Sequence, residues 1–460
     1  MKNENYLTDR KKLINAMENA LSHKRKPVPL REVKDRICAT NKRYENLDER
    51  DIETLFSGES GFPDSLFIKV GEGYLVRRQV EERLKIRVRR EAATFGFHIF
   101  HKNVSRTELD SKQSIRKFHE PARAQKLEQQ INFLKEHENE LLDYFASGRD
   151  VKPNEIWPKI EVVESGHLSG DLFRYTSLLW SVPVSNGFGR RIRFLVWDEY
   201  SEKLIGIFAI GDPVFNLTCR DNWIGWNYLQ RENRLYNVMD IFVLGAAPPF
   251  NELLGGKLVA MISTTDKVQQ IVKTKYKEST TIISGIRKDP TLVLLTTGSA
   301  LGRSALYDRI TFDGQKLFVR IGESKGWGHF HLNNGLFALL KNYIDGTVPG
   351  KSSNRFGNGP NWKIRTMRTA LTQLNIPSDL LRHGVKREIY GIPLAYNFSE
   401  FLRGENDDIR FKELYFDSLV SYWKDRWLKG RIERKRDFVN FNRNKIPELI
   451  RGKQEVDSKE

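Results

Sequence analysis

The sequence predicts a multidomain α+β protein, with a mixed α/β core between an N-terminal helical region and a basic C-terminal region. Three observations predict this fold class. The chain has 460 residues, which is more than one hydrophobic core normally accommodates. Its residues are 39% hydrophobic and 11% aromatic, which is sufficient for folded domains. Apolar residues at helical spacing dominate the first part of the chain, whereas β-rich runs separated by turn residues dominate its middle.

The N-terminal segment, residues 1–90, is expected to be a basic module of the winged-helix type. The stretches PLREVKDRICATN and LDERDIETLFSG have helical spacing, and SLFIKVGEGYLVRR indicates two strands around a Gly-Glu-Gly turn. Arg77 and Arg78 would then end the hairpin, where a wing contacts phosphate. A small helical cap with solvated arginines is the alternative.

The second segment, residues 91–160, is expected to be helical and to end in a linker. In PARAQKLEQQINFLKEHENELLDYFASG the apolar residues trace one helix face, which is normally a packing surface. These residues are Leu127, Ile131, Leu134, Leu141 and Phe145. The two prolines of DVKPNEIWP then indicate the linker.

The third segment, residues 161–345, is expected to be the mixed α/β core. RIRFLVWDEYSEKLIGIFAIGDP predicts a hairpin, YNVMDIFVLG a strand, and LVAMISTTDKVQQIVKTKY a helix. TLVLLTTGS predicts a buried strand, ALGRSALYDRI a short helix, and ITFDGQKLFVRIG a second hairpin with an Asp-Gly turn.

A paired glycine opens the helix of this core, in GAAPPFNELLGGKLVA. Free N–H groups and the positive end of the helix dipole can bind an anion there, with Gly255, Gly256 and Lys257 as the contacting residues. Close packing of the helix start against the sheet is the alternative. Arg303 lies in the first turn of the next predicted helix, where a cation needs a neighbouring anion, so Arg303 and Ser304 are further candidates. A neighbouring acid within the fold would explain Arg303 equally well.

The fourth segment, residues 346–460, is rich in basic and aromatic residues. Basic and aromatic residues are interleaved in VPGKSSNRFGNGPNWKIRTMR and SYWKDRWLKGRIERKRDFVNFNRNK, a pattern that suits base stacking together with phosphate contact. The candidate contacts are Lys363, Arg365, Arg434, Lys435 and Arg436. Trp423 and Trp427, four residues apart, are expected to anchor a helix to the core.

The net charge of +17 and the pI near 9.6 predict a nucleic-acid partner, DNA in the first instance. No apolar run is long enough to span a bilayer, so no membrane partner is expected. Two cysteines, Cys38 and Cys219, exclude a disulfide framework and a multi-cysteine zinc site. A cytoplasmic protein is therefore predicted.

The order of elements in the core resembles the GNAT acyltransferase fold, in which the helix after the fourth strand binds the pyrophosphate of acyl-CoA. The family pattern is Gln or Arg, two residues, Gly, one residue, and Gly or Ala. Glu252 and Lys257 depart from that pattern at its first and last positions, and only Gly255 fits. The resemblance also implies a tyrosine that protonates the departing thiolate, and Tyr307, five residues before Phe312, matches its spacing. An active acyltransferase or a nucleic-acid-modifying enzyme is thus one alternative function; a packed, structural tyrosine is the simpler interpretation. The cofactor, if any, stays unknown.

Aspartates in the same segment allow a second alternative, a metal-dependent nuclease or a transposase-like enzyme. Asp212, Asp221 and Asp240 could hold divalent cations if the fold brings them together. Their contexts also suit turn and cap aspartates.

Several long strings, in the same order, closely resemble the DruA family of the Druantia anti-phage defence systems. They include FLVWDEYSEKLIGIFAIGDPVFNLTCRDNWIGW, MDIFVLGAAPPFNELLGGKLVA, LTTGSALGRSALYDRITF, GPNWKIR and LLRHGVKREIY. The resemblance implies a bacterial defence role beside other Druantia proteins, including a large helicase-like subunit. It implies no established reaction.

Overall fold

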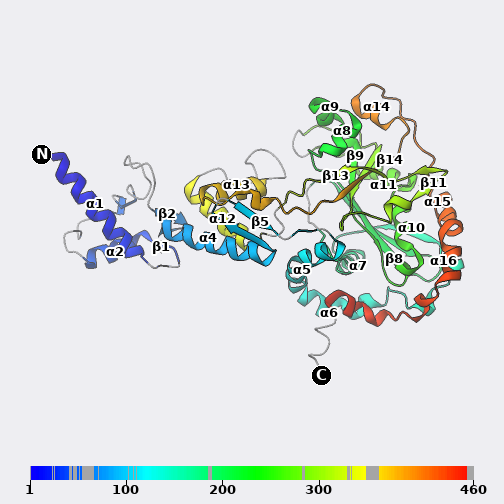
Figure 1. Cartoon of the computed structure of the whole chain (residues 1–460), viewed down its shortest axis with the longest axis horizontal. Coiled ribbons are helices and arrows are strands. Elements are labelled where there is room, and N and C mark those ends of the chain that lie inside the picture. The colour runs from blue at the N-terminus through cyan, green and yellow to red at the C-terminus, as the bar shows by residue number, and fades with distance from the viewer. Residues whose placement is uncertain are drawn as a thin grey trace. The chain divides into compact units, whose positions relative to one another are not determined.

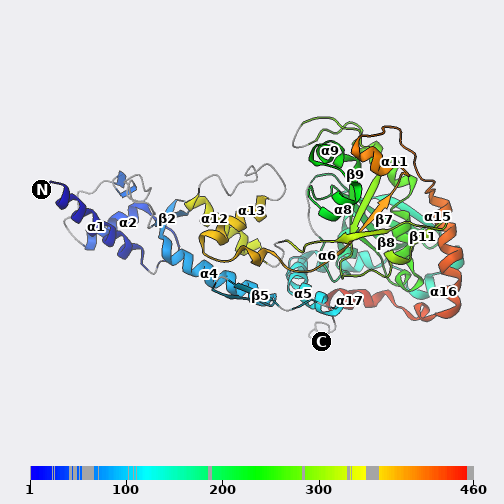
Figure 2. The ribbon, with the colours of Figure 1, turned by 45° about the horizontal axis from the view of Figure 1, so that its top comes forward.

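The computed structural model of the chain divides into two compact units. One comprises Met1–Thr107 and Trp327–His383, and the other comprises Glu108–Gly326 and Gly384–Glu460 (Figures 1 and 2). The structure describes residues 2–22, 24, 26–40, 44, 49–50, 52–53, 67–70, 72–101, 103–106, 108–109, 111–184, 189–281, 285–328, 332, 334–348 and 362–452. This division into two units does not test the four segments expected from the sequence, which stay a prediction. None of the described helices is long and apolar enough to cross a membrane.

The first unit begins with two helices and a small antiparallel sheet. Its elements are α1 (Lys2–Leu21), β1 (Val28–Pro29), α2 (Leu30–Thr40), β2 (Phe67–Val70) and β3 (Gly73–Val76). The strand order is β1-β3-β2, and both pairs are antiparallel. Met17, Leu21, Val33 and Ile37 are buried in the core between the helices and the sheet. The hairpin predicted around the Gly-Glu-Gly turn is confirmed.

A long basic helix follows β3 without a loop. Helix α4 (Arg77–Thr94) begins at the residue after the hairpin, so Arg77 and Arg78 lie in its first turn and not at the end of the hairpin, and their contact with phosphate stays a prediction. The helix forms here because Leu84, Val88 and Ala92 recur every four residues and are all buried. Residues 97–106, predicted to be helical, form instead a second hairpin, β4 (Phe97–Phe100) and β5 (Asn103–Arg106).

Two helices from much later in the chain complete the first unit. They are α12 (Asn334–Thr347) and α13 (Trp362–Gln373). Tyr343 of α12 donates a hydrogen bond of 2.7 Å to Glu81 of α4. Gly346 allows α12 to approach β2 closely, since a Cβ there would lie 2.6 Å from the Lys69 carbonyl oxygen.

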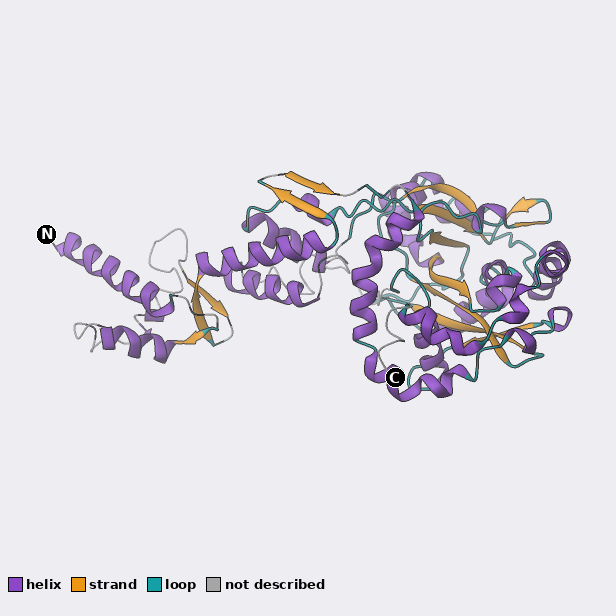
Figure 3. Ribbon diagram, turned by 60° about the horizontal axis from the view of Figure 1, so that its bottom comes forward, coloured by secondary structure: helices purple, strands orange, loops and turns teal. Residues whose placement is uncertain are grey.

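A seven-stranded mixed sheet forms the centre of the second unit (Figure 3). The strands are β6 (Pro158–Val162), β7 (Arg191–Asp198), β8 (Lys203–Gly211), β9 (Val238–Ala246), β10 (Leu294–Gly298), β13 (Val319–Glu323) and β14 (Glu388–Pro393). Their order is β13-β14-β10-β9-β8-β7-β6. The pair β9–β10 is parallel, and the other five pairs are antiparallel. A separate short hairpin pairs β11 (Thr311–Phe312) with β12 (Gln315–Lys316). The predicted α+β class and the predicted hairpin over β7 and β8 are confirmed.

Helices cover both faces of this sheet. Along β8, Phe208 and Ile210 belong to one core cluster, whereas Ile207 and Ala209 belong to another, as the alternation of a strand requires. The first cluster includes α10 (Gly255–Ile262), α11 (Asp266–Tyr276) and α15 (Phe416–Trp423). The second includes α6 (Ile131–Leu142), α7 (Leu168–Ser177) and α17 (Ile446–Arg451).

The remaining helices of the second unit are α5 (Lys112–Glu128), α8 (Thr218–Ile224), α9 (Tyr228–Arg234), α14 (Phe398–Arg403) and α16 (Lys429–Arg434). Helices α8 and α14 pack with the starts of β9 and β10 in a further apolar cluster. The predicted anchoring role of Trp423 is confirmed, because its side chain is 1% exposed and its Nε1 donates to the Leu254 carbonyl at 3.2 Å.

Candidate functional site

A half-buried carboxylate lies in the middle of the sheet, on the parallel strand pair. Asp240 of β9 is in register with Thr296 of β10, and the Thr296 hydroxyl donates a 2.8 Å hydrogen bond to Asp240 Oδ1. Burial raises the pKa of Asp240, while the Thr296 hydrogen bond and the charges of neighbouring arginines act in the opposite direction. Those arginines are Arg220, Arg387 and Arg191. We call Asp240, Thr296, Arg387, His119 and Tyr307 the polar centre.

Arg387 precedes β14 and is a poorly satisfied member of the polar centre. Burial lowers the pKa of its guanidinium, and Asp240 opposes that shift. Its Nε is a buried donor with no hydrogen-bond partner among the residues that the structure describes. A buried N–H group without a partner costs free energy, so this position retains a capacity to bind an acceptor.

His119 of α5 places an imidazole where the charge of Arg387 acts on it. Its side chain is 1% exposed, and burial together with the charge of Arg387 lowers its pKa to about 4. The ring is therefore neutral at pH 7. Nothing in the sequence around His119 or Arg387 indicated that they would meet, because α5 and the residue before β14 lie far apart along the chain.

Tyr307 was predicted as a general acid, and the structure brings it near Asp240. Its ring stacks on Phe318 at 4.9 Å between centroids and meets Tyr390 edge-on at 5.2 Å. Burial raises the pKa of its hydroxyl to about 12, with a contribution of the same sign from Asp240 and an opposing one from Thr297. The hydroxyl thus keeps its proton at neutral pH, as a general acid must. Its catalytic role stays a prediction.

The glycines at the start of α10 are closely packed. A Cβ on Gly255 would lie 2.7 Å from the Phe250 carbonyl oxygen, and a Cβ on Gly256 would lie 3.0 Å from Leu306 Cδ1. Lys257 is buried over the Trp427 ring at 4.3 Å, and burial lowers its pKa to about 8. The surroundings of Gly255 therefore favour the close-packing alternative, and anion binding at the start of α10 stays a prediction.

Glu252, just before this helix, is bound by the C-terminal helices. Lys435 Nζ lies 2.5 Å from Glu252 Oε2, and Arg431 Nε donates to the Glu252 carbonyl at 2.7 Å. Figure 1 shows α15 and α16 beside α10; Arg431 lies in α16, and Lys435 follows that helix directly. Lys435, predicted to contact nucleic acid, thus has a structural partner.

Arg303 and Ser304 belong to a separate polar group. The predicted helix around them is wrong, because only a 3-10 turn, Tyr307–Arg309, forms there. Arg303 Nε pairs with Asp308 at 3.1 Å, and the Ser304 N–H lies 3.4 Å from Glu388 Oε2. An acid within the fold, the alternative considered from the sequence, accounts for Arg303.

The three candidate metal-binding aspartates have separate surroundings. Asp212 accepts from the backbone N–H and the Nε of Arg190, both at 2.8 Å. Asp221 accepts from Arg220, Arg231 and Trp226. Among the described residues, no group of three or more His, Cys, Asp or Glu side chains is placed to hold a metal ion.

The remaining nucleic-acid candidates divide into engaged and exposed side chains. Arg77 pairs with Glu81 at 2.8 Å, and Lys363 lies over the Phe337 ring at 5.3 Å. Arg365 is half-buried. Arg78, Arg434 and Arg436 are exposed.

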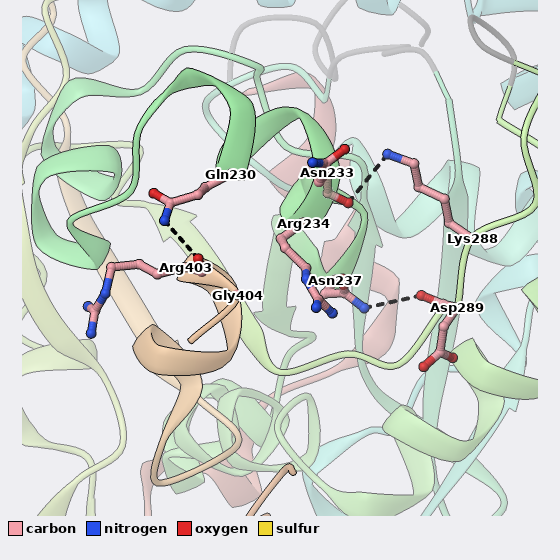
Figure 4. Close-up of a pocket in the computed structure, with 8 residues that line it drawn as sticks. All are labelled: Gln230, Asn233, Arg234, Asn237, Lys288, Asp289, Arg403 and Gly404. Carbon is pink, nitrogen blue, oxygen red and sulfur yellow. Dashed lines mark hydrogen bonds between the residues drawn. The ribbon is translucent and has the colours of Figure 1, made fainter. Parts of the chain in front are cut away.

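A pocket that sequence reasoning missed opens beside α9 (Figure 4). It has a volume of about 450 Å³ and is lined by Gln230, Asn233, Arg234, Asn237, Lys288, Asp289, Arg403 and Gly404. Its polar groups are used within the fold: Gln230 bonds the Arg403 carbonyl at 2.7 Å, and Lys288 bonds the Glu232 carbonyl at 2.9 Å. Arg234 and Arg403 pair with Asp407 and Glu405. The pocket therefore presents little uncompensated charge.

Comparisons with known proteins find one family. The family model described as Druantia protein DruA matches residues 109–404, a range that contains the whole seven-stranded sheet. The Druantia protein DruA of Escherichia coli (strain UMEA 4076-1) is 42% identical over 331 residues, which are 71% of this chain and 82% of that protein. No solved structure matches the chain.

Proposed function

The chain belongs to the DruA family of Druantia proteins, and on this premise we propose that it is a nucleic-acid-binding component of an anti-phage defence system. The family match supports the defence role. The net charge of +17 supports a polyanionic partner, DNA in the first instance. The chain would act in a complex with other Druantia proteins that include a helicase-like subunit.

The arginines of α4 carry this proposal. With Leu84, Val88 and Ala92 buried, the rest of the helix surface exposes five arginines: Arg78, Arg83, Arg87, Arg89 and Arg90. Arg87 pairs with Glu91. Arg78, Arg89 and Arg90 form no ion pair within the described part of the chain, although the charge of Glu82 acts on Arg78 and Arg89. Three exposed guanidinium groups without an ion pair on one helix suit a phosphate backbone.

The topology before α4 supports a winged-helix-like module. Two helices precede an antiparallel hairpin, β2–β3, and β1 adds a third strand beside β3. This arrangement is consistent with the module predicted from the sequence. The phosphate contacts proposed here lie on α4, next to that module.

Salt dependence of binding tests the proposal. The affinity of the full chain for a labelled DNA should fall steeply between low and moderate salt, with a log-log slope of several units. Replacing Arg78, Arg89 and Arg90 together by Gln should reduce the slope by roughly 0.9 for each phosphate of duplex DNA that the variant no longer neutralises. Fluorescence anisotropy measures both.

The matched control is Arg149→Gln, which removes an exposed arginine in the other unit. Its slope should equal that of the wild type. A wild-type slope near zero, or an equal reduction with the control, contradicts the proposal.

A second candidate function is enzymatic, and the polar centre favours it. β9 is the fourth strand of the large sheet along the chain, α10 follows it, and β10 lies parallel to it, which supports a GNAT-like core. Tyr307 as a protonated acid, neutral His119 and half-buried Asp240 are groups that proton transfer can use. The packing at Gly255 argues against acyl-CoA as the co-substrate. The test is a variant of the polar centre that keeps its fold and loses defence.

A further inference from the structure

The hairpin β4–β5 has two different faces. Phe97 is 1% exposed, and Ile99 and Val104 are half-buried, so this face packs inward. His98, Phe100, Asn103 and Ser105 all point to the other face, because side chains alternate along a strand, and all four are exposed. The hairpin therefore presents an outer surface of two rings and two hydrogen-bonding side chains.

Phe100 is the prominent side chain of this outer surface. It is 65% exposed, and its ring stacks against that of His98, with 6.4 Å between centroids and 28° between planes. A single exposed apolar residue is ordinary. Here, however, the exposed ring has an aromatic neighbour, His98, two residues earlier on the same strand.

The hairpin is held firmly by its inner end. Phe97 is paired with Arg106 in register, and Arg106 donates a 2.9 Å hydrogen bond to the Arg382 carbonyl oxygen. The backbone N–H groups of Phe95 and Gly96 bond the carbonyls of Ala92 and Ala93 at the end of α4. The outer surface is thus tied to the end of the arginine-bearing helix.

The arginines of α4 lie close in sequence to the His98 and Phe100 rings of β4. Helix α4 ends at Thr94, four residues after Arg90 and three before β4 begins. At 1.5 Å per residue, Arg90 lies roughly 6 Å along the helix axis from that end. The arginines and the rings thus lie on consecutive elements of the first unit.

We propose that the outer surface of β4–β5 stacks on unpaired bases of a single-stranded nucleic acid whose phosphates bind to the arginines of α4. This inference rests on the proposed nucleic-acid function and adds the form that is recognised. A ring can stack only on an exposed base face. In a duplex those faces are covered by neighbouring bases, and insertion requires unstacking. A strand with free bases meets both surfaces without that cost.

Substitution of Phe100 tests the inference in the full chain. Phe100→Ala should weaken binding to a labelled oligothymidine by roughly 5- to 100-fold, the loss of one stacked base. Binding to a blunt duplex of the same length should change less than two- to three-fold, by about the scatter of such measurements. Phe100→Trp should restore oligothymidine binding, since a larger ring stacks at least as well.

The control is Leu229→Ala, which removes a side chain of similar exposure, 66%, from α9 in the other unit. It should leave both affinities unchanged. Thermal unfolding should be the same for both variants, because neither side chain is buried. A Phe100→Ala protein that binds oligothymidine as the wild type does, or loses duplex binding equally, overturns the inference. If wild-type binding stays salt-dependent in that case, the nucleic-acid function itself survives.

Discussion

Asp221 and Asp240 are both aspartates of the large-sheet unit, and both lie near Arg220, yet their surroundings differ. Asp221 accepts hydrogen bonds from Arg220, Arg231, Trp226 and the Leu217 N–H. Asp240 accepts one from Thr296, is half-buried with its pKa raised, and feels the charge of Arg387, whose Nε has no partner among the described residues. A satisfied network holds a fold together, whereas an incompletely satisfied one keeps the capacity to bind. Three substitutions can break or sharpen this contrast.

The largest effect is expected where the satisfied network is broken. Arg220 is 0% exposed and donates to Asp221 and to the carbonyls of Val214 and Phe215. Arg220→Met leaves these acceptors buried and removes a charge that balances Asp221. We expect it to lower the free energy of unfolding by about 3–5 kcal/mol, measured by chemical denaturation.

Arg303→Met is the control for this change. Arg303 also pairs with an aspartate, Asp308, but its side chain is 81% exposed. An exposed ion pair contributes at most about 1 kcal/mol, so this variant should be nearly as stable as the wild type. Equal losses of unfolding free energy in the two variants would show that the Asp221 network contributes no more to stability than an exposed ion pair does.

A smaller effect on stability is expected at the start of α10, where close packing holds the fold together as the hydrogen bonds of Asp221 do. A Cβ on Gly255 would meet a backbone carbonyl at 2.7 Å, whereas a Cβ on Gly256 would meet the end of a side chain. Gly255→Ala should therefore cost roughly 1–3 kcal/mol of unfolding free energy, and Gly256→Ala should change it by less than about 0.5 kcal/mol. Loss of defence should follow loss of folded protein. If Gly255→Ala keeps full stability and loses defence, the anion site predicted from the sequence is favoured over packing.

Much of the fold could be predicted because local pattern determines it. The hairpin over β7 and β8, the strand β9 and the helix after it follow from alternation, from apolar runs and from paired glycines. The start of α4 was missed although Leu84, Val88 and Ala92 have helical spacing, because Arg77 and Arg78 were assigned to the preceding hairpin. The hairpin β4–β5 was missed because it is short and lies between strongly helical stretches.

The polar centre could be predicted only in part. Asp240 and Tyr307 were singled out for different reasons, and the structure brings them together. Arg387 and His119 carry no local signal, since their meeting depends on how α5 packs near the residue before β14. The same limit applies to α12 and α13, which join the N-terminal unit through contacts such as Tyr343 with Glu81. Partners distant in sequence are set by packing, which a single sequence does not reveal.

The smallest effect on stability, and the clearest on function, is expected from Asp240→Asn. Because the pKa of Asp240 is raised above its ordinary value of 3.8, its ionised form is disfavoured in the folded state. Ionisation of Asp240 therefore lowers the free energy of unfolding as pH rises through that ordinary value. The full loss is present above the pKa of Asp240 in the folded state. Asparagine cannot ionise, so the variant should be more stable than the wild type at pH 7 by about 1 kcal/mol. The difference should vanish in acid, where Asp240 is protonated in both states.

Asp212→Asn should instead lower the free energy of unfolding, because Asp212 is ion-paired with Arg190 at 2.8 Å. If the polar centre is a working site, the stabilised Asp240→Asn protein should fail to protect cells from phage. Full protection by that variant would instead make Asp240 structural, like Asp221.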